Sequence, residues 1–335
     1  MDLSSVKTVL VIKPSSLGDV VHTMAPVTAM KAQFPHLSIR WVVNRQWAPL
    51  LEGHPALEGL VIFPRDELRG VARLPQAFSW MRALKALQPD LALDFQGLLR
   101  SALMGRFARA ARTVGLTGAR EGAGFFYDRK APAPRGLHAI DRYFALVESL
   151  GVERIPGALH FGFSEGVAPR AEVPGDEFVV LHSWSRGEGK SLSEQQVRRF
   201  CEALAPRPVV LVGGGPAGQL AAENAIDLTG STGIVELLWL VRRAAWTVSV
   251  DSGPMHLAAA VSDRVLGIHT WSDPRAVGPC RGSCLVWKSG RIRRVAELAD
   301  DDPELDENRE AKESKLTLED IEAIAARIGK ELDGK

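Results

Sequence analysis

The chain has 335 residues, of which 46% are hydrophobic and 24% charged, so it can bury a sizeable core and is long enough for two domains. No apolar run approaches the roughly 18 residues that a membrane-spanning helix needs, and the first apolar segment is too short for a signal peptide. The three cysteines, Cys201, Cys280 and Cys284, fit a reducing compartment and lack the second Cys or His pair of a zinc site. Together these features predict a cytoplasmic protein.

The charge is distributed unevenly along the chain. Residues 1–150 hold 19 Lys and Arg against 12 Asp and Glu, whereas the remainder holds 22 against 28. A basic half beside an acidic half indicates that the basic half meets an anionic partner. A phosphorylated substrate or an anionic membrane surface fits this pattern. No nucleic acid is expected, because no helix-turn-helix pattern and no basic motif interleaved with aromatic residues is present.

In the first half, short apolar runs alternate with amphipathic segments, which predicts βαβ units and a parallel sheet. Strands are expected near 8–13, 38–43, 59–63 and 90–95, and helices near 19–33, 46–53, 73–87, 97–109 and 138–150. Residues 151–175 contain Pro and Gly without helical periodicity, which is typical of a connection between domains.

The same alternation restarts in the second half. Strands are expected near 178–182, 208–212, 247–250 and 265–269, and helices near 193–204, 216–224, 233–243 and 254–261. Two doubly wound halves in series predict a ligand in the cleft between them, outside the carboxyl ends of the strands. The acidic segment 297–313 predicts a mobile loop. Thr317 and Asp320 then form a capping box that opens a last helix, Leu318 to Leu332.

The turn after the first strand reads "KPSSLGDVVH", residues 13–22, and lacks the glycine-rich fingerprint of a dinucleotide site. Its Asp19 has two interpretations, a cap of the following helix or a carboxylate with a chemical task. From the residues alone, capping is the simpler of the two.

The strongest local signal is "VSVDSGPMHLAAA", residues 248–260. A strand ends at Asp251, Gly253 permits a tight turn, and Pro254 suits the first helical position. The free N–H groups of that helix would receive a phosphate, with His256 as a further donor. In the alternative interpretation Asp251 or Ser252 only caps the helix and His256 is a surface residue.

Residues 179–197, "VVLHSWSRGEGKSLSEQQV", leave a strand into a polar loop before a helix capped at Ser193. Hydroxyl groups with Arg186 and Lys190 at the end of a strand suit a diphosphate, although a solvated loop explains them equally well. The glycine-rich turn at 211–219 lacks the full dinucleotide spacing and indicates close packing.

Further cations and polar groups follow strands in the first half. Asp94, Gln96 and Arg100 come at the end of the strand near 90–95. Arg65, Arg69 and Arg73 are spaced four apart and would share one face of a helix. Either set is a solvated face or, given the positive excess, a phosphate-binding patch.

In combination these stretches resemble the ADP-heptose:lipopolysaccharide heptosyltransferases of glycosyltransferase family 9, and within it the heptosyltransferase I branch. The similarity runs in the family's order over roughly residues 8–280, through "VLVIKPSSLGDVVHTMAPV", "DFQGLLRSAL", "GFFYDRK", "HAIDRYFAL", "LHSWSRGEGK", "SVDSGPMHLAAA" and "TWSDP". The resemblance implies an α/β protein of the GT-B fold, with two Rossmann-like doubly wound domains that face each other across a cleft. Residues 1–160 would bind the acceptor and 161–315 the nucleotide sugar, with 316–335 as a last helix that packs back on the first domain.

The resemblance also implies an activity. L-glycero-D-manno-heptose would pass from ADP-heptose to Kdo of the lipopolysaccharide inner core, with inversion and without a metal or cofactor. The enzyme would be a cytoplasmic monomer in peripheral contact with the inner membrane and with a lipid A-Kdo type anionic acceptor.

The family's functional residues fall on positions of this chain. The general base falls on Asp19, and Lys190, Ser185 and the helix after Gly253 would stabilise the departing diphosphate. The candidate donor-binding residues are Ser183, Trp184, Ser185, Arg186, Lys190, Asp251, Ser252, Gly253 and His256. The candidate acceptor-binding residues are Ser15, Ser16, Gly18, His22, Arg65, Arg69, Arg73, Gln96, Arg100, Arg129 and Lys130.

The chain departs from the family in two places. The donor loop carries Trp184-Ser185 where paired hydroxyl residues are usual, and after about residue 280 the similarity fades. Two alternatives therefore stay open, a family 9 enzyme with another nucleotide sugar or glycan acceptor, and a nucleotide-sugar-binding protein without catalysis. The presence of Asp19 favours an enzyme. A dehydrogenase is disfavoured, because neither half has a full G-x-G-x-x-G after a strand.

Overall fold

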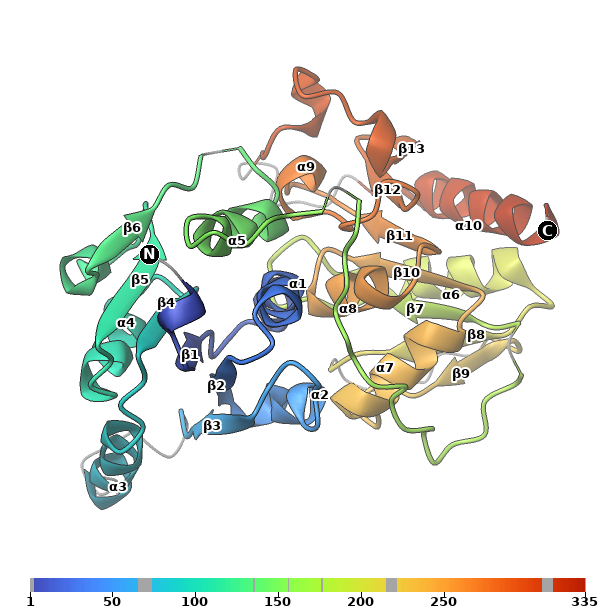
Figure 1. Ribbon diagram of the computed structural model, residues 1–335. Helices are drawn as coiled ribbons and strands as arrows, with labels where there is room; N and C mark the ends of the chain where they lie inside the picture. Colours follow the sequence, from blue (N-terminus) through green and yellow to red (C-terminus); the bar gives the residue numbers. More distant parts are fainter. Residues whose placement is uncertain are drawn as a thin grey trace. The chain divides into compact units, whose positions relative to one another are not determined.

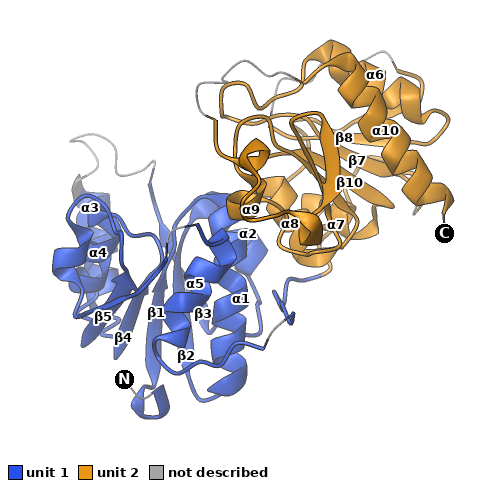
Figure 2. Cartoon of the chain, turned by 90° about the horizontal axis from the view of Figure 1, so that it is seen from above, with its two compact units in different colours: residues 1–164 blue, residues 165–335 orange. Residues whose placement is uncertain are grey.

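The computed structural model describes residues 3–65, 74–134, 136–155, 157–175, 177–214, 222–308 and 316–334. The chain divides into two compact units, residues 1–164 and 165–335 (Figure 2). Each unit contains one sheet with helices against it, as the alternation of strand and helix patterns predicts (Figure 1).

The sheet of the first unit is parallel throughout, in the order β3-β2-β1-β4-β5-β6. Its central strands are continuous apolar runs because helices cover both faces of such a sheet. The two outer strands β5 and β6 were not predicted, since "RTVGL" and "RKA" are short and carry charged residues. The strands are β1 Thr8–Ile12, β2 Ser38–Asn44, β3 Gly59–Phe63, β4 Leu91–Asp94, β5 Arg112–Leu116 and β6 Arg129–Ala131.

Helix α1 follows the central strand and packs against α5. It is buried around most of its circumference, so its sequence reads as apolar rather than amphipathic. The helix expected at 46–53 is shorter, a turn of 3-10 helix followed by α2. The helices are α1 Leu17–Gln33, α2 Ala48–Leu51, α3 Leu74–Lys85, α4 Leu99–Phe107 and α5 Ala139–Glu148, with 3-10 turns η1 Leu3–Ser5, η2 Arg45–Trp47 and η4 Ala123–Phe126.

The sheet of the second unit has the order β13-β12-β11-β10-β7-β8-β9 and is parallel except for the hairpin of β12 and β13. This hairpin and the short β9 were not predicted. The strands are β7 Val179–His182, β8 Val209–Val212, β9 Ala225–Asp227, β10 Trp246–Val250, β11 Val265–Ile268, β12 Leu285–Lys288 and β13 Arg291–Arg294. The helices are α6 Glu194–Leu204, α7 Ile234–Arg243, α8 Gly253–Val261, α9 Pro274–Val277 and α10 Leu318–Asp333, with η5 Val295–Glu297 and η6 Pro303–Leu305.

Helix α10 begins at the predicted capping box, where the Asp320 N–H donates to Thr317 Oγ1 over 3.1 Å. Its apolar stripe includes Ile321 and Ile328, which are fully buried in one cluster with Phe200 of α6. The stripe packs on α6 within the second unit, and the expectation that this helix also packs back on the first domain stays a prediction. The helix expected at 216–224 falls mostly on residues 215–221, outside the described ranges.

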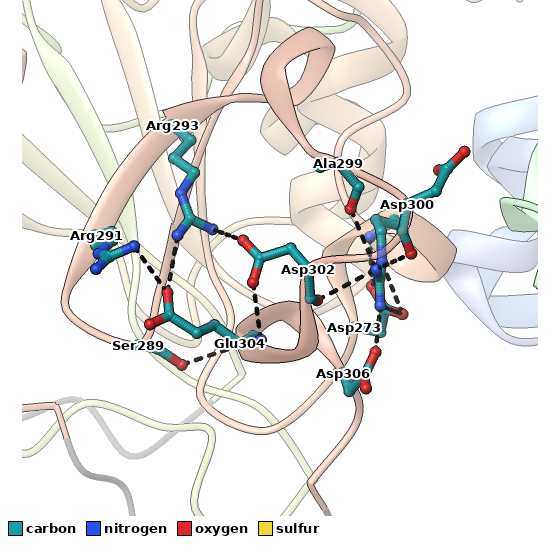
Figure 3. Close-up of polar contacts among 10 residues, drawn as sticks. Asp273, Ser289, Arg291, Arg293, Ala299, Asp300, Asp302, Glu304 and Asp306 are labelled. Carbon is teal, nitrogen blue, oxygen red and sulfur yellow. Dashed lines mark hydrogen bonds and ion pairs between the residues drawn. The ribbon is translucent and has the colours of Figure 1, made fainter.

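Residues 299–308, here called the acidic strap, are held in place by arginines, so the described part of the predicted mobile loop is anchored (Figure 3). The Arg275 guanidinium donates to the carbonyl oxygens of Ala299 and Asp300 over 3.2 and 2.6 Å and to Asp306 Oδ1 over 2.5 Å. Arg293 of β13 pairs with Glu304 over 3.0 Å. The acidic side chains of the strap would repel one another if they stood alone. Arginines from α9 and β13 neutralise them.

Candidate active site

The Asp19 carboxylate lies in the first turn of α1, directly after the central strand of the first unit. Its Oδ2 accepts hydrogen bonds from the N–H and the hydroxyl group of Ser16, at 3.1 and 2.8 Å. A carboxylate at the third helical position that accepts from the N-cap residue also complements the positive end of the helix. The capping interpretation of Asp19 is therefore confirmed, and it engages only one of the two oxygens.

The second oxygen belongs to a cluster of three side chains. Tyr143 of α5 donates its hydroxyl hydrogen to Asp19 Oδ1 over 2.6 Å, and Lys13 Nζ lies 3.6 Å from the same oxygen. Lys13 also donates to the Tyr143 hydroxyl oxygen over 2.8 Å. The Lys13 side chain is only 3% exposed, whereas that of Asp19 is 35% exposed. The cluster therefore has a buried cation behind it and an accessible carboxylate in front.

The environment keeps this carboxylate ionised. Burial raises the pKa of Asp19, but the charge of Lys13 and the hydrogen bonds from Tyr143 and Ser16 outweigh it, so the net pKa lies below its usual range. Burial lowers the pKa of Lys13, against the opposing effect of Asp19. Burial, with the negative charge of Asp19 next to it, raises the pKa of Tyr143 well above its usual value, so Tyr143 stays a hydrogen-bond donor.

A second carboxylate, Asp94 at the end of β4, braces the neighbouring loop. It is fully buried, and burial raises its pKa. Its Oδ1 accepts from the N–H groups of Gln96 and Gly97 at 2.9 and 3.0 Å. Its Oδ2 accepts from the hydroxyl groups of Ser101 and Tyr127 at 2.8 and 2.7 Å. With all these bonds made, Asp94 is a structural carboxylate that shapes the loop after β4.

That loop supports the Asp19 turn from the side. The Gln96 side-chain oxygen accepts from the Ser15 N–H over 3.3 Å, so this predicted acceptor-binding residue holds the turn. Gly115 of β5 lies against Tyr127, and a Cβ atom at position 115 would come within 2.2 Å of the Tyr127 ring. The absence of a side chain at Gly115 thus allows Tyr127 to reach Asp94.

The remaining predicted acceptor residues are scattered over the first unit. His22 is buried, with its ring 5.2 Å from that of His138, so the prediction that it contacts the acceptor is not supported by its position. Arg129 and Lys130 are exposed and consecutive on β6, so their side chains point to opposite faces. Gly18 is buried and Ser16 exposed at the start of α1, whereas Arg69 and Arg73 lie outside the described residues.

In the second unit, Lys190 and Asp251 form a close ion pair, with 2.5 Å between Nζ and Oδ2. Their side chains are 15% and 7% exposed. The Lys190 ammonium group also lies 4.2 Å from the centre of the Trp271 ring, and Trp271 Nε1 donates to the Glu188 carbonyl oxygen over 3.2 Å. The predicted loop lysine and strand-end aspartate therefore meet, with an indole ring as the third member.

The charge state of this pair follows from its burial. Burial raises the pKa of Asp251, but the charges of His269 and Lys190 and the hydrogen bond from Lys190 outweigh it, so the pKa lies below its usual range. Burial lowers the pKa of His269 to about 4, so its ring is neutral at neutral pH. Lys190 is therefore the cation that holds Asp251 ionised under those conditions.

Helix α8 starts at Gly253, two residues after Asp251, and has no side-chain cap. The Ser252 hydroxyl group lies at the N-cap but donates to the Val250 carbonyl oxygen over 3.0 Å and sits 3.1 Å from His182 Nδ1. The interpretation in which Asp251 or Ser252 caps this helix is wrong. His256 is buried rather than on the surface. No side-chain oxygen caps the start of α8, so the positive end of its helix dipole is left to an anion.

The rest of the donor loop folds over the glycine-rich turn after β8. Trp184 lies beside Gly213 and Gly214, where added Cβ atoms would come within 3.8 and 3.7 Å of it. Both distances are ordinary van der Waals contacts, so Trp184 does not itself require glycine at either position. Gly213 instead has a φ of +142°, a backbone conformation that favours glycine. Ser183 and Ser185 are half-buried in this loop and Arg186 is exposed.

Three residues of these sites were missed from the sequence: Lys13, Tyr143 and Trp271. Of the three, only Lys13 could have been recognised from the sequence. A lysine that directly follows a buried strand is expected to be buried itself and therefore to need a partner of opposite charge. Tyr143 lies on the apolar face of α5 beside buried Ile140 and Val147, where an aromatic residue is ordinary core.

Within the described residues, no helix combines the length and apolarity needed to cross a bilayer. Those same residues also contain no group of three or more His, Cys, Asp and Glu side chains that could hold a metal ion.

Comparison with known proteins gives one consistent result. Residues 77–304 match the model of glycosyltransferase family 9 (heptosyltransferase). Lipopolysaccharide heptosyltransferase 1 of Pseudomonas aeruginosa is 30% identical over 297 residues, which cover 81% of this chain and 80% of that protein. Its namesake from Escherichia coli K12 is 28% identical, over 84% of this chain and 94% of that protein.

Solved structures agree with this. The structure described as E. coli heptosyltransferase WaaC with ADP has a TM-score of 0.73 at 26% identity, covering 83% of this chain and 92% of that chain. E. coli heptosyltransferase II, 18% identical with a TM-score of 0.73, shares the fold. The two Rossmann-like units are those of a GT-B glycosyltransferase. The family match continues to residue 304, so the expected fading after residue 280 is wrong. This chain belongs to glycosyltransferase family 9, the heptosyltransferases.

Proposed function

We propose that the protein transfers L-glycero-D-manno-heptose from ADP-heptose to Kdo of the lipopolysaccharide inner core, with inversion at the anomeric carbon. The relatives support the substrates, since two are named lipopolysaccharide heptosyltransferase 1. One E. coli structure is described with ADP and another with ADP-2-deoxy-2-fluoro heptose.

The observation that carries the proposal is the state of Asp19. Its lowered pKa keeps it ionised at neutral pH, and its 35% exposure leaves room for an acceptor hydroxyl group. A carboxylate with a low pKa is a weak base in solution, so its effect comes from position. Tyr143 and Ser16 fix that position. Oδ2 already accepts both hydrogen bonds from Ser16, whereas Oδ1 accepts one from Tyr143 and keeps lone-pair capacity for one more donor.

The chemistry then divides between the two units. The acceptor oxygen forms a bond to the anomeric carbon of heptose while the bond from that carbon to the diphosphate oxygen breaks, and the hydroxyl proton passes to Asp19. Lys190 and the positive end of the α8 dipole stabilise the charge on the departing ADP. Asp251 holds Lys190 in place until the diphosphate binds. Positive charge from the protein takes the role that a divalent cation has in other transferases, so neither a metal nor a cofactor takes part.

The proposal also includes a location. The positive excess of the first 150 residues would hold the enzyme, as a monomer, on the cytoplasmic face of the inner membrane, where a lipid-linked anionic acceptor lies.

The decisive experiment is a transfer assay. Purified protein is incubated with ADP-heptose and Kdo-lipid A in the presence of EDTA, and the product is examined by mass spectrometry and, for anomeric configuration, by NMR. We expect one added heptose with inverted configuration and an unchanged rate in EDTA. Product formed only with other nucleotide sugars would support another family 9 specificity. ADP-heptose binding without product from any donor would support a non-catalytic protein.

A further inference from the structure

The first unit contains a pocket of about 550 Å³ beside α3 and α4, apart from the Asp19 cluster. This volume is in the range of ligand sites. Its walls are mainly apolar, and two arginines and one glutamate complete them. The apolar walls include Phe63, Trp80, Met81, Leu103 and Phe107, and the charged residues are Arg65, Arg100 and Glu121.

The walls follow from helical spacing. Leu99, Leu103 and Phe107 recur every fourth residue of α4 and form one stripe along that helix. Ala77, Trp80 and Met81 form the facing stripe of α3. The large side chains of the two stripes do not fill the space between the helices. The pocket therefore extends along α4, from Leu99 to Phe107.

The walls are also fixed in place. The Trp80 indole N–H donates to the Ile62 carbonyl oxygen over 2.8 Å, and its ring lies 5.2 Å from that of Phe63. A pocket with anchored aromatic walls is present before a ligand arrives, so binding there carries a small ordering cost.

The two ends of the pocket differ in character. Arg100, in the first turn of α4, places its guanidinium 5.6 Å from the centre of the Phe63 ring, and Arg65 follows the end of β3. Phe107 ends α4 and is 45% exposed. One end is therefore cationic and the other apolar, which is the polarity of an anionic lipid.

The cationic end also has a defined place in the fold. Arg65 follows β3 and Arg100 follows β4, whereas Asp19 follows β1. These strands are parallel members of one sheet, so all three residues lie at its carboxyl edge. A ligand whose charged part lies at this edge has that part on the same side of the sheet as Asp19.

We infer that this pocket receives an acyl chain of the anionic lipid acceptor, whose acidic groups pair with Arg65 and Arg100 while its sugar hydroxyl group reaches Asp19. This inference rests on the proposed function and adds to it a recognition site for the lipid part of the acceptor. The shared sheet edge favours the acceptor over an unrelated membrane lipid. Glu121 is outnumbered by the two arginines, so the charged end stays attractive to an anion.

The first test compares acceptors with and without acyl chains. Wild-type enzyme should have a KM at least about tenfold lower for acylated than for fully deacylated Kdo-lipid A, since each buried methylene group contributes to binding. Leu103→Glu, which places a charge in the pocket, and Leu103→Trp, which fills it, should abolish this ratio. Both should leave the KM for the deacylated acceptor unchanged.

The matched control is Arg106→Glu. Arg106 is exposed on the same helix and does not line the pocket, so this variant should keep the wild-type ratio. Circular dichroism establishes that each variant is folded. An undiminished ratio in both Leu103 variants would overturn the inference, and so would a wild-type ratio near one.

The second test does not depend on transfer. Dodecyl phosphate, kept below its critical micelle concentration, should change the fluorescence of wild-type protein. Trp80→Phe should remove most of that change, because the other indoles lie outside the pocket walls. No change in wild-type protein would contradict the inference whatever the assay shows. If wild-type protein shows the fluorescence change but transfers no sugar, the lipid-binding pocket is supported and the proposed function is contradicted.

A bilayer lipid is the competing occupant. Vesicles of brominated phosphatidylglycerol should leave Trp80 fluorescence unquenched if the pocket is reserved for the acceptor. Quenching that Trp80→Phe removes, together with no KM advantage for the acylated acceptor, would show a membrane-lipid site and overturn the inference.

Discussion

Asp19 and Asp251 occupy corresponding places in the two units, and they differ in what they leave accessible. Each follows a central strand and has a lysine next to it. Asp19 lies in the first turn of a helix, and Asp251 lies just before one. Lys13 is the buried partner of an accessible Asp19, whereas Asp251 is the buried partner of a more accessible Lys190. One unit thus presents a negative group and the other a positive group.

The cause is the position of each aspartate relative to the helix start. Asp19 lies inside the first turn of α1, so its carboxylate folds back on the helix and occupies the positive end. Asp251 stands one residue before the N-cap of α8 and turns to Lys190. The end of α8 is therefore left for a ligand anion. A shift of a few residues in the same strand–turn–helix pattern separates an aspartate that occupies the helix start from one that leaves it uncapped.

The largest expected effect on activity comes from removing the negative charge of Asp19. Asp19→Asn should lower kcat by about a hundredfold or more, the usual scale for a positioned general base, and leave the Kd for ADP unchanged. Asparagine keeps an oxygen for the Ser16 hydrogen bonds, so the helix start is preserved. Steady-state kinetics and titration calorimetry give the two values. Near-normal turnover would remove Asp19 from the mechanism.

The second effect is on the donor side. Lys190→Met should weaken ADP binding by about tenfold or more, because a charge-assisted contact to the diphosphate is lost. It should also lower the free energy of unfolding by about 3 kcal/mol, since Asp251 is left buried and unpaired. Titration calorimetry and urea unfolding measure the two effects.

A double variant separates the two roles of Lys190. Lys190→Met with Asp251→Asn should recover most of the stability, because the unpaired buried charge is gone, but none of the ADP affinity. If the double variant also regains ADP binding, Lys190 serves the fold and not the donor.

The smallest effect concerns the pH profile. The hydrogen bond from Tyr143 lowers the pKa of Asp19, and the base acts only when ionised, so activity falls as the pH falls through that pKa. Tyr143→Phe removes the hydrogen bond and raises the pKa, which should move the acidic limb of kcat/KM to higher pH. Tyr127→Phe is the matched control, since Tyr127 bonds to Asp94 instead. An unmoved limb for Tyr143→Phe would contradict the assignment of that limb to Asp19.

Local sequence was sufficient for the central strands and for most helices. The runs that became β1 and β7 are apolar except for Thr8 at the start of one and His182 at the end of the other, because both faces of the sheet are covered. The capping box at Thr317 involves residues three apart. The edge strand β6 was not recognisable, since its three residues include two exposed cations. Short length and charged side chains keep an exposed edge strand from pairing with another chain, and the same features hide such a strand from sequence patterns.

The site itself was predictable in part. Asp19, Lys190 and Asp251 lie in motifs whose spacing is visible. The contacts that assign their roles are distant, since Tyr143 meets Lys13 across 130 residues and Asp19 across 124. The acidic strap was misjudged for the same reason, because Arg275 precedes its partners by 24 to 31 residues. Composition shows the charges of a segment and does not show which cations reach it.

Gly115 is a position of low mutational tolerance on β5, outside the Asp19 turn itself. Even a methyl group there would displace Tyr127, which bonds to Asp94. The loop that Asp94 shapes carries Gln96, which in turn holds Ser15 in the Asp19 turn. The next strand outward, β6, has no such link from its exposed cations. Residues of β6 can therefore vary while the surroundings of Asp19 are held unchanged, so the outer edge of this sheet is free to diversify without disturbing the Asp19 turn.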